Sequence, residues 1–293
     1  MQELAQAVVG GLASGGIYAS LALAIVLIYR STGVVNFAQG EMATFTTFVC
    51  WSLLHHDVSK WLAFGLTLAI AFAGGVALER TIVRPVEQAS PAVVVILTIG
   101  LLVGLNGLTT AIWSAEVKEF PSAFPERSVE VAGVPVSWQD IGIVGVTLVA
   151  VAALAVFFRY TKLGLGLRAA AVNPEASRLV GVRVGWMLAL GWGLAATLGA
   201  LSGILIAPIV SLEPTMMQGV LLYALAAAVL GGLDSPVGAV VGGLALGVGI
   251  NLLGTYVDAV DANLELAVAL LVILAVLLVR PSGLLGRPAV SRV

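Results

Sequence analysis

The sequence predicts an all-α fold, a polytopic membrane bundle of about 8–9 transmembrane helices that the whole chain, residues 1–293, forms as a single domain. Three observations lead to this prediction. Hydrophobic residues make up 60% of the chain and charged residues only 10%, whereas a soluble domain is about 25% charged. The apolar residues stand in long unbroken runs, unlike the short alternating strands of a transmembrane barrel. The chain also has 34 glycines, and small residues let membrane helices approach closely.

Charge balance and cysteine content exclude several classes of protein. Because 14 Lys and Arg stand against 16 Asp and Glu, no basic surplus exists for a nucleic acid. The single cysteine, Cys50, excludes an internal disulfide framework and a cysteine-based zinc site. His55 and His56 adjoin Asp57, but neighbouring histidines on one loop point apart. We predict neither a metal site nor a catalytic residue.

The membrane-spanning segments follow from the apolar runs, because a spanning helix needs about 20 predominantly apolar residues. Seven runs approach or exceed that length: Val8–Tyr29, Phe37–Leu54, Trp61–Leu78, Ala92–Trp113, Ile141–Phe158, Met187–Val210 and Leu264–Val279. Between the last two lies Gly219–Gly254, which is broken at Gly231–Pro236. Its first arm, Gly219–Leu230, is too short for an upright span, and its second, Val237–Leu253, nearly crosses. Two crossings and a re-entrant arm both fit this region.

The Lys and Arg residues of the loops predict the orientation, because cytoplasmic loops are enriched in them. One side of the membrane holds most of them: Arg30, Arg80, Arg84, Arg159, Lys162, Arg168, Arg178, Arg183, Arg280, Arg287 and Arg292. The other side holds Lys60, Lys118 and Arg127. We therefore expect the N-terminus outside and the C-terminus inside. Residues 114–140 then form an external loop, and residues 159–186 form a basic cytoplasmic loop.

The cytoplasmic loop has the pattern of two short helices. Arg168–Val172 is rich in alanine and ends before Pro174, because a proline disfavours helical backbone in the residue before it. A second turn, Pro174–Val180, starts with proline at its first position and closes at Gly181. The apolar face of such a pair fits a groove on a cytoplasmic partner. The alternative is a basic loop that lies on anionic lipid headgroups.

Polar residues within the apolar runs are candidates for a translocation pathway. Asn36, Gln39 and Glu41 stand at the start of the second run, and ionisable groups at membrane depth usually face a cavity or a partner. A carboxylate at a helix N-terminus is also favoured by the helix dipole, so a capping role for Glu41 fits equally well. Asn106 and Asn251 are further pathway candidates, although an isolated amide in a span more often makes an interhelical hydrogen bond.

Small residues recur every fourth position along three segments. They are Gly191, Ala195, Gly199 and Gly203, then Gly11 and Gly15, then Gly238 and Gly242. This spacing predicts close helix packing, either inside the chain or with a partner subunit.

The sequence contains no phosphate-binding loop of the Gly-x-x-x-x-Gly-Lys-Ser/Thr type. Apart from Glu41, the spans carry no chain of Asp, Glu or His that would relay protons. If the protein transports against a gradient, the energy therefore enters through another chain.

Several segments carry a family resemblance. They are Gly11–Leu23, the run Thr32-Gly-x-x-Asn-Phe-Ala-x-Gly-Glu41, Glu79-Arg-x-x-x-Arg-Pro-Val86, Gly164–Ala169 with Asn173 and Gly181, Ala228–Gly238, and Arg280–Pro288. In this order they resemble the H-type (LivH-like) permease subunits of branched-chain amino acid ABC transporters. Ser20 stands where the family usually has leucine.

The resemblance implies a multi-pass permease with an ABC importer fold in the bacterial inner membrane. Such a subunit moves branched-chain or related amino acids by ATP-driven alternating access and is not itself an enzyme. Its partners are a homologous second permease subunit, two cytoplasmic ATPases and a periplasmic or extracellular solute-binding protein, with the lipid bilayer around it. ATP and magnesium bind the ATPases, so no cofactor is expected in this chain.

The resemblance also assigns a coupling role to part of the cytoplasmic loop. The residues implied are Gly166, Arg168, Ala169, Ala170, Asn173, Glu175, Ala176, Leu179 and Gly181. Two alternatives to this function remain, a urea or short-chain amide ABC permease and an ion-coupled secondary transporter that uses Glu41.

Overall fold

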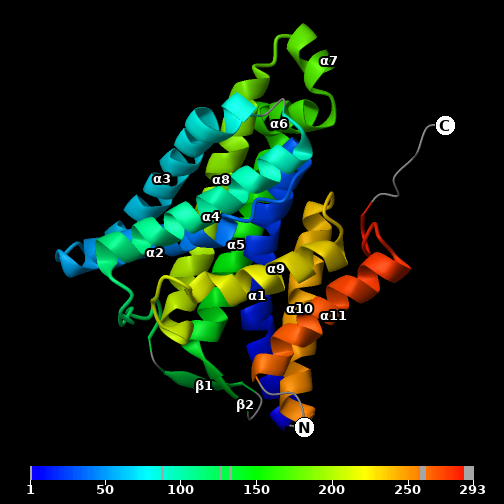
Figure 1. Ribbon diagram of the computed structural model, residues 1–293. Helices are drawn as coiled ribbons and strands as arrows, with labels where there is room; N and C mark the ends of the chain where they lie inside the picture. Colours follow the sequence, from blue (N-terminus) through cyan, green and yellow to red (C-terminus); the bar gives the residue numbers. More distant parts are fainter. Residues whose placement is uncertain (1, 87–88, 126, 132–133, 258–261, 287–293) are drawn as a thin grey trace. The chain divides into compact units, whose positions relative to one another are not determined.

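The computed structural model describes residues 2–86, 89–125, 127–131, 134–257 and 262–286 (Figure 1). Its helices are α1 (Gln2–Thr32), α2 (Gln39–His55), α3 (Lys60–Leu78), α4 (Pro91–Trp113), α5 (Trp138–Tyr160), α6 (Lys162–Val172), α7 (Pro174–Leu179), α8 (Val184–Val210), α9 (Met216–Gly231), α10 (Pro236–Tyr256) and α11 (Ala262–Val279). The strands are β1 (Ser128–Val131) and β2 (Val134–Ser137). Arg287, Arg292 and Pro288, which the sequence predictions used, lie outside the described residues.

The hairpin of β1 and β2 is the part of the fold that the all-α prediction missed. The two strands pair antiparallel, with Val129 opposite Val136 and Ser128 opposite Ser137. Valine alternates here with polar residues, which is the pattern of a half-buried strand. The external loop predicted over residues 114–140 thus contains a hairpin and the first turn of α5, which begins at Trp138.

The apolar runs form helices, as predicted, and the chain is a multi-pass membrane protein. Within the described residues, 6 helices are long and apolar enough to cross a membrane: α1, α3 with its extension to Val86, α4, α5, α8 and α10. Met216–Gly231 and Leu264–Val279 are shorter apolar helices. The start of α1 lies before the predicted Val8, because Gln2–Ala7 are mostly good helix formers that an apolar-run criterion overlooks.

The chain folds into two compact units. Unit 1 comprises Met1–Val26, Pro121–Leu148 and Gln218–Val293, and unit 2 comprises Leu27–Phe120 and Val149–Met217. Helices α1, α5 and α9 each contribute residues to both units. The prediction of a single domain over residues 1–293 stays a prediction.

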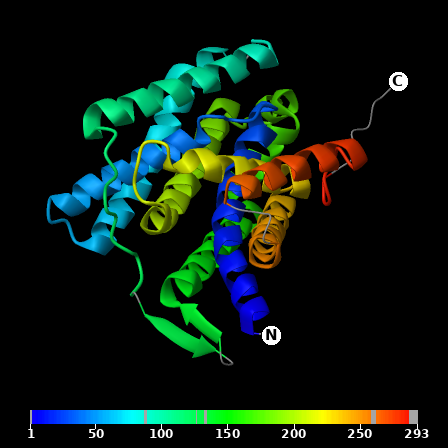
Figure 2. The same cartoon turned by 60° about the horizontal axis from the view of Figure 1, so that its bottom comes forward.

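In unit 1, glycines bring α10 against both α1 and α9. A Cβ on Gly15 of α1 would lie 2.9 Å from the carbonyl oxygen of Gly243, and a Cβ on Gly11 would lie 2.7 Å from the Cα of Val248. Since the α1 numbers rise as the α10 numbers fall, these two helices run antiparallel. Gly238 and Gly242 face Gly231 and Ala227 in the same antiparallel sense. Figures 1 and 2 both show α9, α10 and α11 side by side.

The region Gly219–Gly254, for which the sequence allowed either two crossings or a re-entrant arm, forms the antiparallel helices α9 and α10. The chain reverses direction between Gly231 and Pro236, so the two arms form a helical hairpin. Helix α9 has 16 residues and α10 has 21. At 1.5 Å per residue, α9 is about 24 Å long, which is shorter than a typical hydrocarbon core of about 30 Å. Two full crossings of this region stay a prediction.

The segment after α11 returns to the same turn. The backbone N–H of Leu284 donates to the carbonyl of Leu230 at 2.8 Å, and that of Leu285 donates to the carbonyl of Gly231 at 3.0 Å. These bonds cap two carbonyls at the end of α9, which otherwise lack helical partners. Gly232 and Gly283 have φ values of +109° and +74°, which favour glycine, and they lie against each other.

In unit 2, α8 packs against both α2 and α3, which also contact each other. Gly75 and Gly193 allow the backbones of α3 and α8 to touch, since a Cβ on Gly75 would lie 2.6 Å from the carbonyl oxygen of Trp192. Helix α3 continues through a π-helical turn, Glu79–Val83, and a short 3₁₀ turn, Arg84–Val86. The Arg80 guanidinium lies 3.4 Å above the ring of Trp186, near the start of α8.

Candidate functional site

The first candidate site is the pair of short helices α6 and α7, which we call the coupling segment (residues 161–181). Each helix starts at a side-chain cap: Thr161 Oγ1 accepts from Gly164 N–H at 2.9 Å, and Asn173 Oδ1 accepts from Ala176 N–H at 2.9 Å. The cap at Thr161 explains why α6 begins at Lys162 rather than at the predicted Arg168. Gly181, with φ of +83°, follows the end of α7.

One face of the coupling segment is fixed to α8. Ala170 is 1% exposed and packs in a small apolar cluster with Val184 and Leu188 of α8, against which Met187 also packs. Ser177 of α7 is buried as well. Because α6 is held through a buried side chain, the coupling segment is anchored to the start of α8.

The opposite face of the coupling segment is exposed and apolar at its tip. Val172 is 77% exposed, Leu179 89% and Val180 78%. The predicted coupling residues divide between the two faces. Arg168, Asn173, Glu175, Ala176, Leu179 and Gly181 are exposed, Gly166 and Ala169 are half-buried, and Ala170 is buried. Ala170 therefore faces α8 in this structure, and its coupling role stays a prediction.

The second candidate site is the polar start of α2. Asn36, Gln39 and Glu41 are 0%, 0% and 2% exposed. Asn36 Oδ1 accepts from the backbone N–H of Ala38 at 3.0 Å, and Asn36 Nδ2 donates to Gln39 Oε1 at 3.4 Å. Gln39 Nε2 donates to the carbonyl of Ala195 on α8 at 2.9 Å. In the described conformation these amides join α2 to α8 inside unit 2.

Glu41 lies in the first turn of α2, where the helix dipole favours a carboxylate. Asn106 of α4 donates from Nδ2 both to Glu41 Oε2 at 3.2 Å and to the carbonyl of Pro214 at 3.0 Å. This one amide thus joins α2, α4 and the segment after α8. The capping and interhelical roles that the sequence offered are both compatible with this geometry, and a pathway role for Asn36, Gln39, Glu41 and Asn106 stays a prediction.

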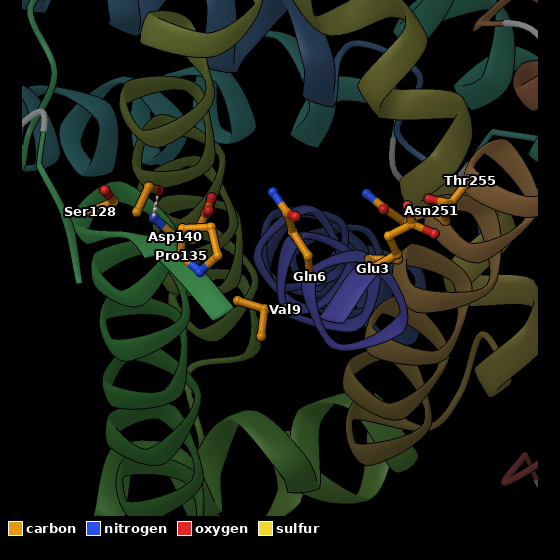
Figure 3. Close-up of a pocket in the computed structure, with 11 residues that line it drawn as sticks. Glu3, Gln6, Val9, Ser128, Pro135, Asp140, Asn251 and Thr255 are labelled. Atoms are coloured by element: carbon orange, nitrogen blue, oxygen red, sulfur yellow. Dashed lines mark hydrogen bonds between the residues drawn. The ribbon is translucent and has the colours of Figure 1, made fainter. Parts of the chain in front are cut away.

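Asn251, the fifth pathway candidate, belongs to unit 1, whereas the other four belong to unit 2. It lies on α10 and lines two cavities in unit 1, one of 720 Å³ and one of 170 Å³. Figure 3 shows the larger cavity.

The small residues predicted at helix contacts lie against other parts of this chain. Gly199 and Gly203 of α8 face Gln39, Ala43 and Thr47 of α2, and the Ala195 carbonyl accepts from Gln39. A Cβ on Gly191 would lie 3.8 Å from the side chain of Leu167 on α6. Gly11 and Gly15 face α10, and Gly238 and Gly242 face α9.

Sequence reasoning did not single out Gly75, Gly193, Gly243, Gly247 or Glu265. Gly243 and Gly247 share the four-residue spacing and so carried a detectable signal. Glu265 is a carboxylate at the start of the last apolar run, where its charge was the signal. Gly75 and Gly193 contact each other from positions 118 residues apart (193 − 75), which no local pattern reveals.

Comparison with known proteins agrees with this architecture. Residues 7–279 match the family described as "Branched-chain amino acid transport system / permease component". The chain is 29% identical to the high-affinity branched-chain amino acid transport system permease protein LivH of Salmonella typhimurium, over 98% of this chain and 97% of that protein. It is 30% identical to the permease protein BraD of Pseudomonas aeruginosa, again over 98% and 97%.

A solved structure, PsaBC from Streptococcus pneumoniae in complex with Fab, is similar in fold. The TM-score is 0.50 at 13% sequence identity, over 96% of this chain and 93% of that chain. A match at this identity supports the fold alone. The family match covers nearly the whole chain, including the coupling segment and every predicted pathway residue. The chain therefore belongs to the permease component family of branched-chain amino acid transport systems, and it is a transport subunit rather than an enzyme.

Proposed function

We propose that this chain is a transmembrane permease subunit of a binding-protein-dependent ABC importer that carries branched-chain amino acids across the bacterial inner membrane. Relatives at 29% and 30% identity over 98% of the chain are named as branched-chain amino acid permeases, which supports this substrate class. A homologous second permease subunit, two cytoplasmic ATPases and an external solute-binding protein complete the transporter.

The observation that carries the proposal is the two-faced coupling segment. Its apolar tip, Val172, Leu179 and Val180, is almost fully exposed, although an apolar surface of this kind is costly in water. An ATPase groove that covers the tip removes that cost. The opposite face is anchored to α8, so a displacement of the tip is passed on to a membrane helix instead of being absorbed by a loose loop.

From α8 the displacement reaches the rest of unit 2 through close contacts. Gly199 and Gly203 touch α2, and Gly193 touches α3. Because such close contacts leave little room for sliding, α2 and α3 follow α8 as the ATPases close and open. The two access states then differ in their contacts, which is the condition for ATP binding to shift one into the other.

The test is the Leu179→Asp variant in the purified transporter. A charge at the tip makes burial in an apolar groove costly, so we expect the ATPases to co-purify at reduced yield and solute-stimulated ATP hydrolysis to be lost. The matched control is Val129→Asp on the exposed face of β1, which places the same charge on an exposed valine away from the coupling segment. Normal ATPase binding and normal stimulation in Leu179→Asp would contradict the coupling role.

The substrate class is tested with the wild-type transporter and its binding protein in liposomes. We expect ATP-dependent uptake of leucine and none of urea. Uptake by the permease alone, driven by an ion gradient without ATPases, would instead favour a secondary transporter.

A further inference from the structure

Unit 1 contains two adjoining cavities with polar linings at the end where the chain begins. The larger, of 720 Å³, is lined by Glu3, Gln6, Ala7, Val9, Gly10, Ser128, Pro135, Ser137, Asp140, Asn251 and Thr255. The smaller, of 170 Å³, is lined by Ser14, Tyr18, Gly247, Ile250, Asn251, Gly254, Thr255 and Glu265. Asn251 and Thr255 belong to both linings, so the cavities meet there. Figure 3 shows Glu3, Gln6 and Asn251 grouped near α1 and α10, with Ser128 and Asp140 across the larger cavity.

Several polar side chains of these linings have no partner in the protein. Within residues 2–257 and 262–286, apart from the short gaps, nothing forms a hydrogen bond or an ion pair with the side chains of Gln6, Asn251 or Glu265. The backbone carbonyl of Asn251 is occupied, since Thr255 Oγ1 donates to it at 2.7 Å. Gln6 is exposed, and Asn251 and Glu265 are half-buried, so these polar groups are accessible to water or to a ligand.

The charge of the lining favours a cation. Glu3 and Asp140 line the larger cavity and Glu265 the smaller, whereas no Lys, Arg or His is among the described lining residues. The described residues contain no group of three or more His, Cys, Asp or Glu that could hold a metal ion. The rings of Tyr18 and Tyr223 stack 5.0 Å apart, and Tyr18 lines the same cavity as Glu265. A carboxylate beside an aromatic face suits an organic ammonium group.

The rest of the smaller cavity matches the other parts of an amino acid. The Asn251 amide can donate to a carboxylate, and Ile250 with Gly247 offers an apolar surface for an aliphatic side chain. We propose that these cavities form a binding site for a zwitterionic aliphatic amino acid, with its ammonium group on Glu265 and its carboxylate on Asn251. This inference rests on the proposed function, because it places the transported solute within this chain.

The first experiment tests access and charge without using transport. In a Cys50→Ala background, Asn251→Cys is treated in membranes with a cationic and with an anionic methanethiosulfonate reagent. We expect the cationic reagent to react about tenfold faster, because a nearby carboxylate attracts it and repels the other. Adding Glu265→Gln should reduce that preference, while Glu3 and Asp140 in the larger cavity retain part of it. Gly249→Cys on the same helix, whose Cβ would meet open space, is the control for membrane-facing positions. Equal rates for the two reagents, or no reaction, would overturn the site.

The second experiment tests the amino-acid chemistry in the assembled transporter. Leucine uptake is measured with 3-methylbutylamine, which keeps the ammonium group, or 4-methylpentanoate, which lacks it, at concentrations that the isolated binding protein does not bind. We expect the amine to inhibit and the acid not to inhibit. Glu265→Gln should raise the KM for leucine about tenfold and abolish inhibition by the amine, as expected for loss of a charge-assisted contact.

A pair of glycine substitutions distinguishes loss of the Glu265 contact from misfolding as the cause of a raised KM. A Cβ on Gly254 would lie 2.6 Å from Glu265 Oε1 and would displace that carboxylate, whereas Gly249 has open space around it. Gly254→Ala should therefore raise the KM and Gly249→Ala should not. If the wild type takes up leucine and neither Glu265→Gln nor Gly254→Ala changes the KM, the site is wrong. If the wild type takes up no leucine, the proposed function is wrong.

Discussion

Single amides make the decisive contacts in unit 2. Asn106 is the clearest case, because its Nδ2 has two acceptors on two different segments, Glu41 Oε2 and the Pro214 carbonyl. Glu41 is 2% exposed, so water cannot easily replace the amide there. Asn106, which the sequence offers as a pathway candidate, thus also links helices through its hydrogen bonds in this conformation.

Replacing Asn106 by leucine removes both of these hydrogen bonds. We expect the free energy of unfolding to fall by about 1–2 kcal/mol, since a hydrogen bond to a charged group contributes more stability than an average interhelical hydrogen bond. The measurement is the thermal unfolding midpoint of the detergent-purified subunit. Gly107→Ala, one position further along α4 and facing open space, is the control and should leave the midpoint unchanged or slightly raised. An unaltered midpoint in Asn106→Leu would show that neither bond stabilises the fold.

At the scale of the helices, side-chain caps and packing hold the coupling segment in place. The coupling segment is short: α6 has 11 residues and α7 has 6. Isolated helices of this length are marginal in water, so caps and packing must hold them. Thr161 and Asn173 supply the caps, and Ala170 supplies the packing against α8.

Asn173→Ala should fray α7, because it removes the acceptor for the Ala176 N–H at a cost of about 1 kcal/mol. The tip residues Leu179 and Val180 then lose their fixed direction. We expect fewer leucine molecules transported per ATP hydrolysed, with the total yield of the transporter unchanged. Asn173→Asp keeps an acceptor at the same position and should restore the wild-type ratio. A normal ratio in Asn173→Ala would mean that α7 is held by its partner and not by its own cap.

At the scale of the whole molecule, helix contacts give the relative directions of neighbouring helices inside each unit. In unit 1, α1 and α9 are antiparallel to α10, and in unit 2, α2 runs parallel to α8 while α3 runs antiparallel to it. These directions agree with the expected sides of the basic loops. The orientation itself rests on the distribution of Lys and Arg.

We expect the C-terminus and the coupling segment to lie in the cytoplasm and the β1–β2 hairpin outside. Green fluorescent protein fused to the C-terminus should therefore fluoresce. An epitope tag inserted between β1 and β2 should be accessible to antibody in cells with a permeabilised outer membrane and an intact inner membrane. A tag inserted directly after Gly181, at the end of the coupling segment, should become accessible only after the inner membrane is opened. The reverse pattern would invert the predicted topology.

Local patterns in the sequence were sufficient for much of this structure. Apolar runs predicted the membrane helices, since about 20 apolar residues in a row have no better environment than lipid. Pro174 and Gly181 predicted the start and end of α7, because proline fixes its own backbone and glycine permits the left-handed turn. The order of short motifs was enough to indicate the family.

Only the tertiary structure decided which polar groups meet. Asn106 and Glu41 are 65 residues apart in sequence, and Gln39 and Ala195 are 156 apart. The gathering of Glu265, Tyr18 and Asn251 around one cavity likewise depends on how α1, α10 and α11 pack. The sequence by itself determined the apolar helices and the family, because these follow from local composition and short motifs. Partners across helices depend on the packing of the whole chain, and no local pattern encodes them.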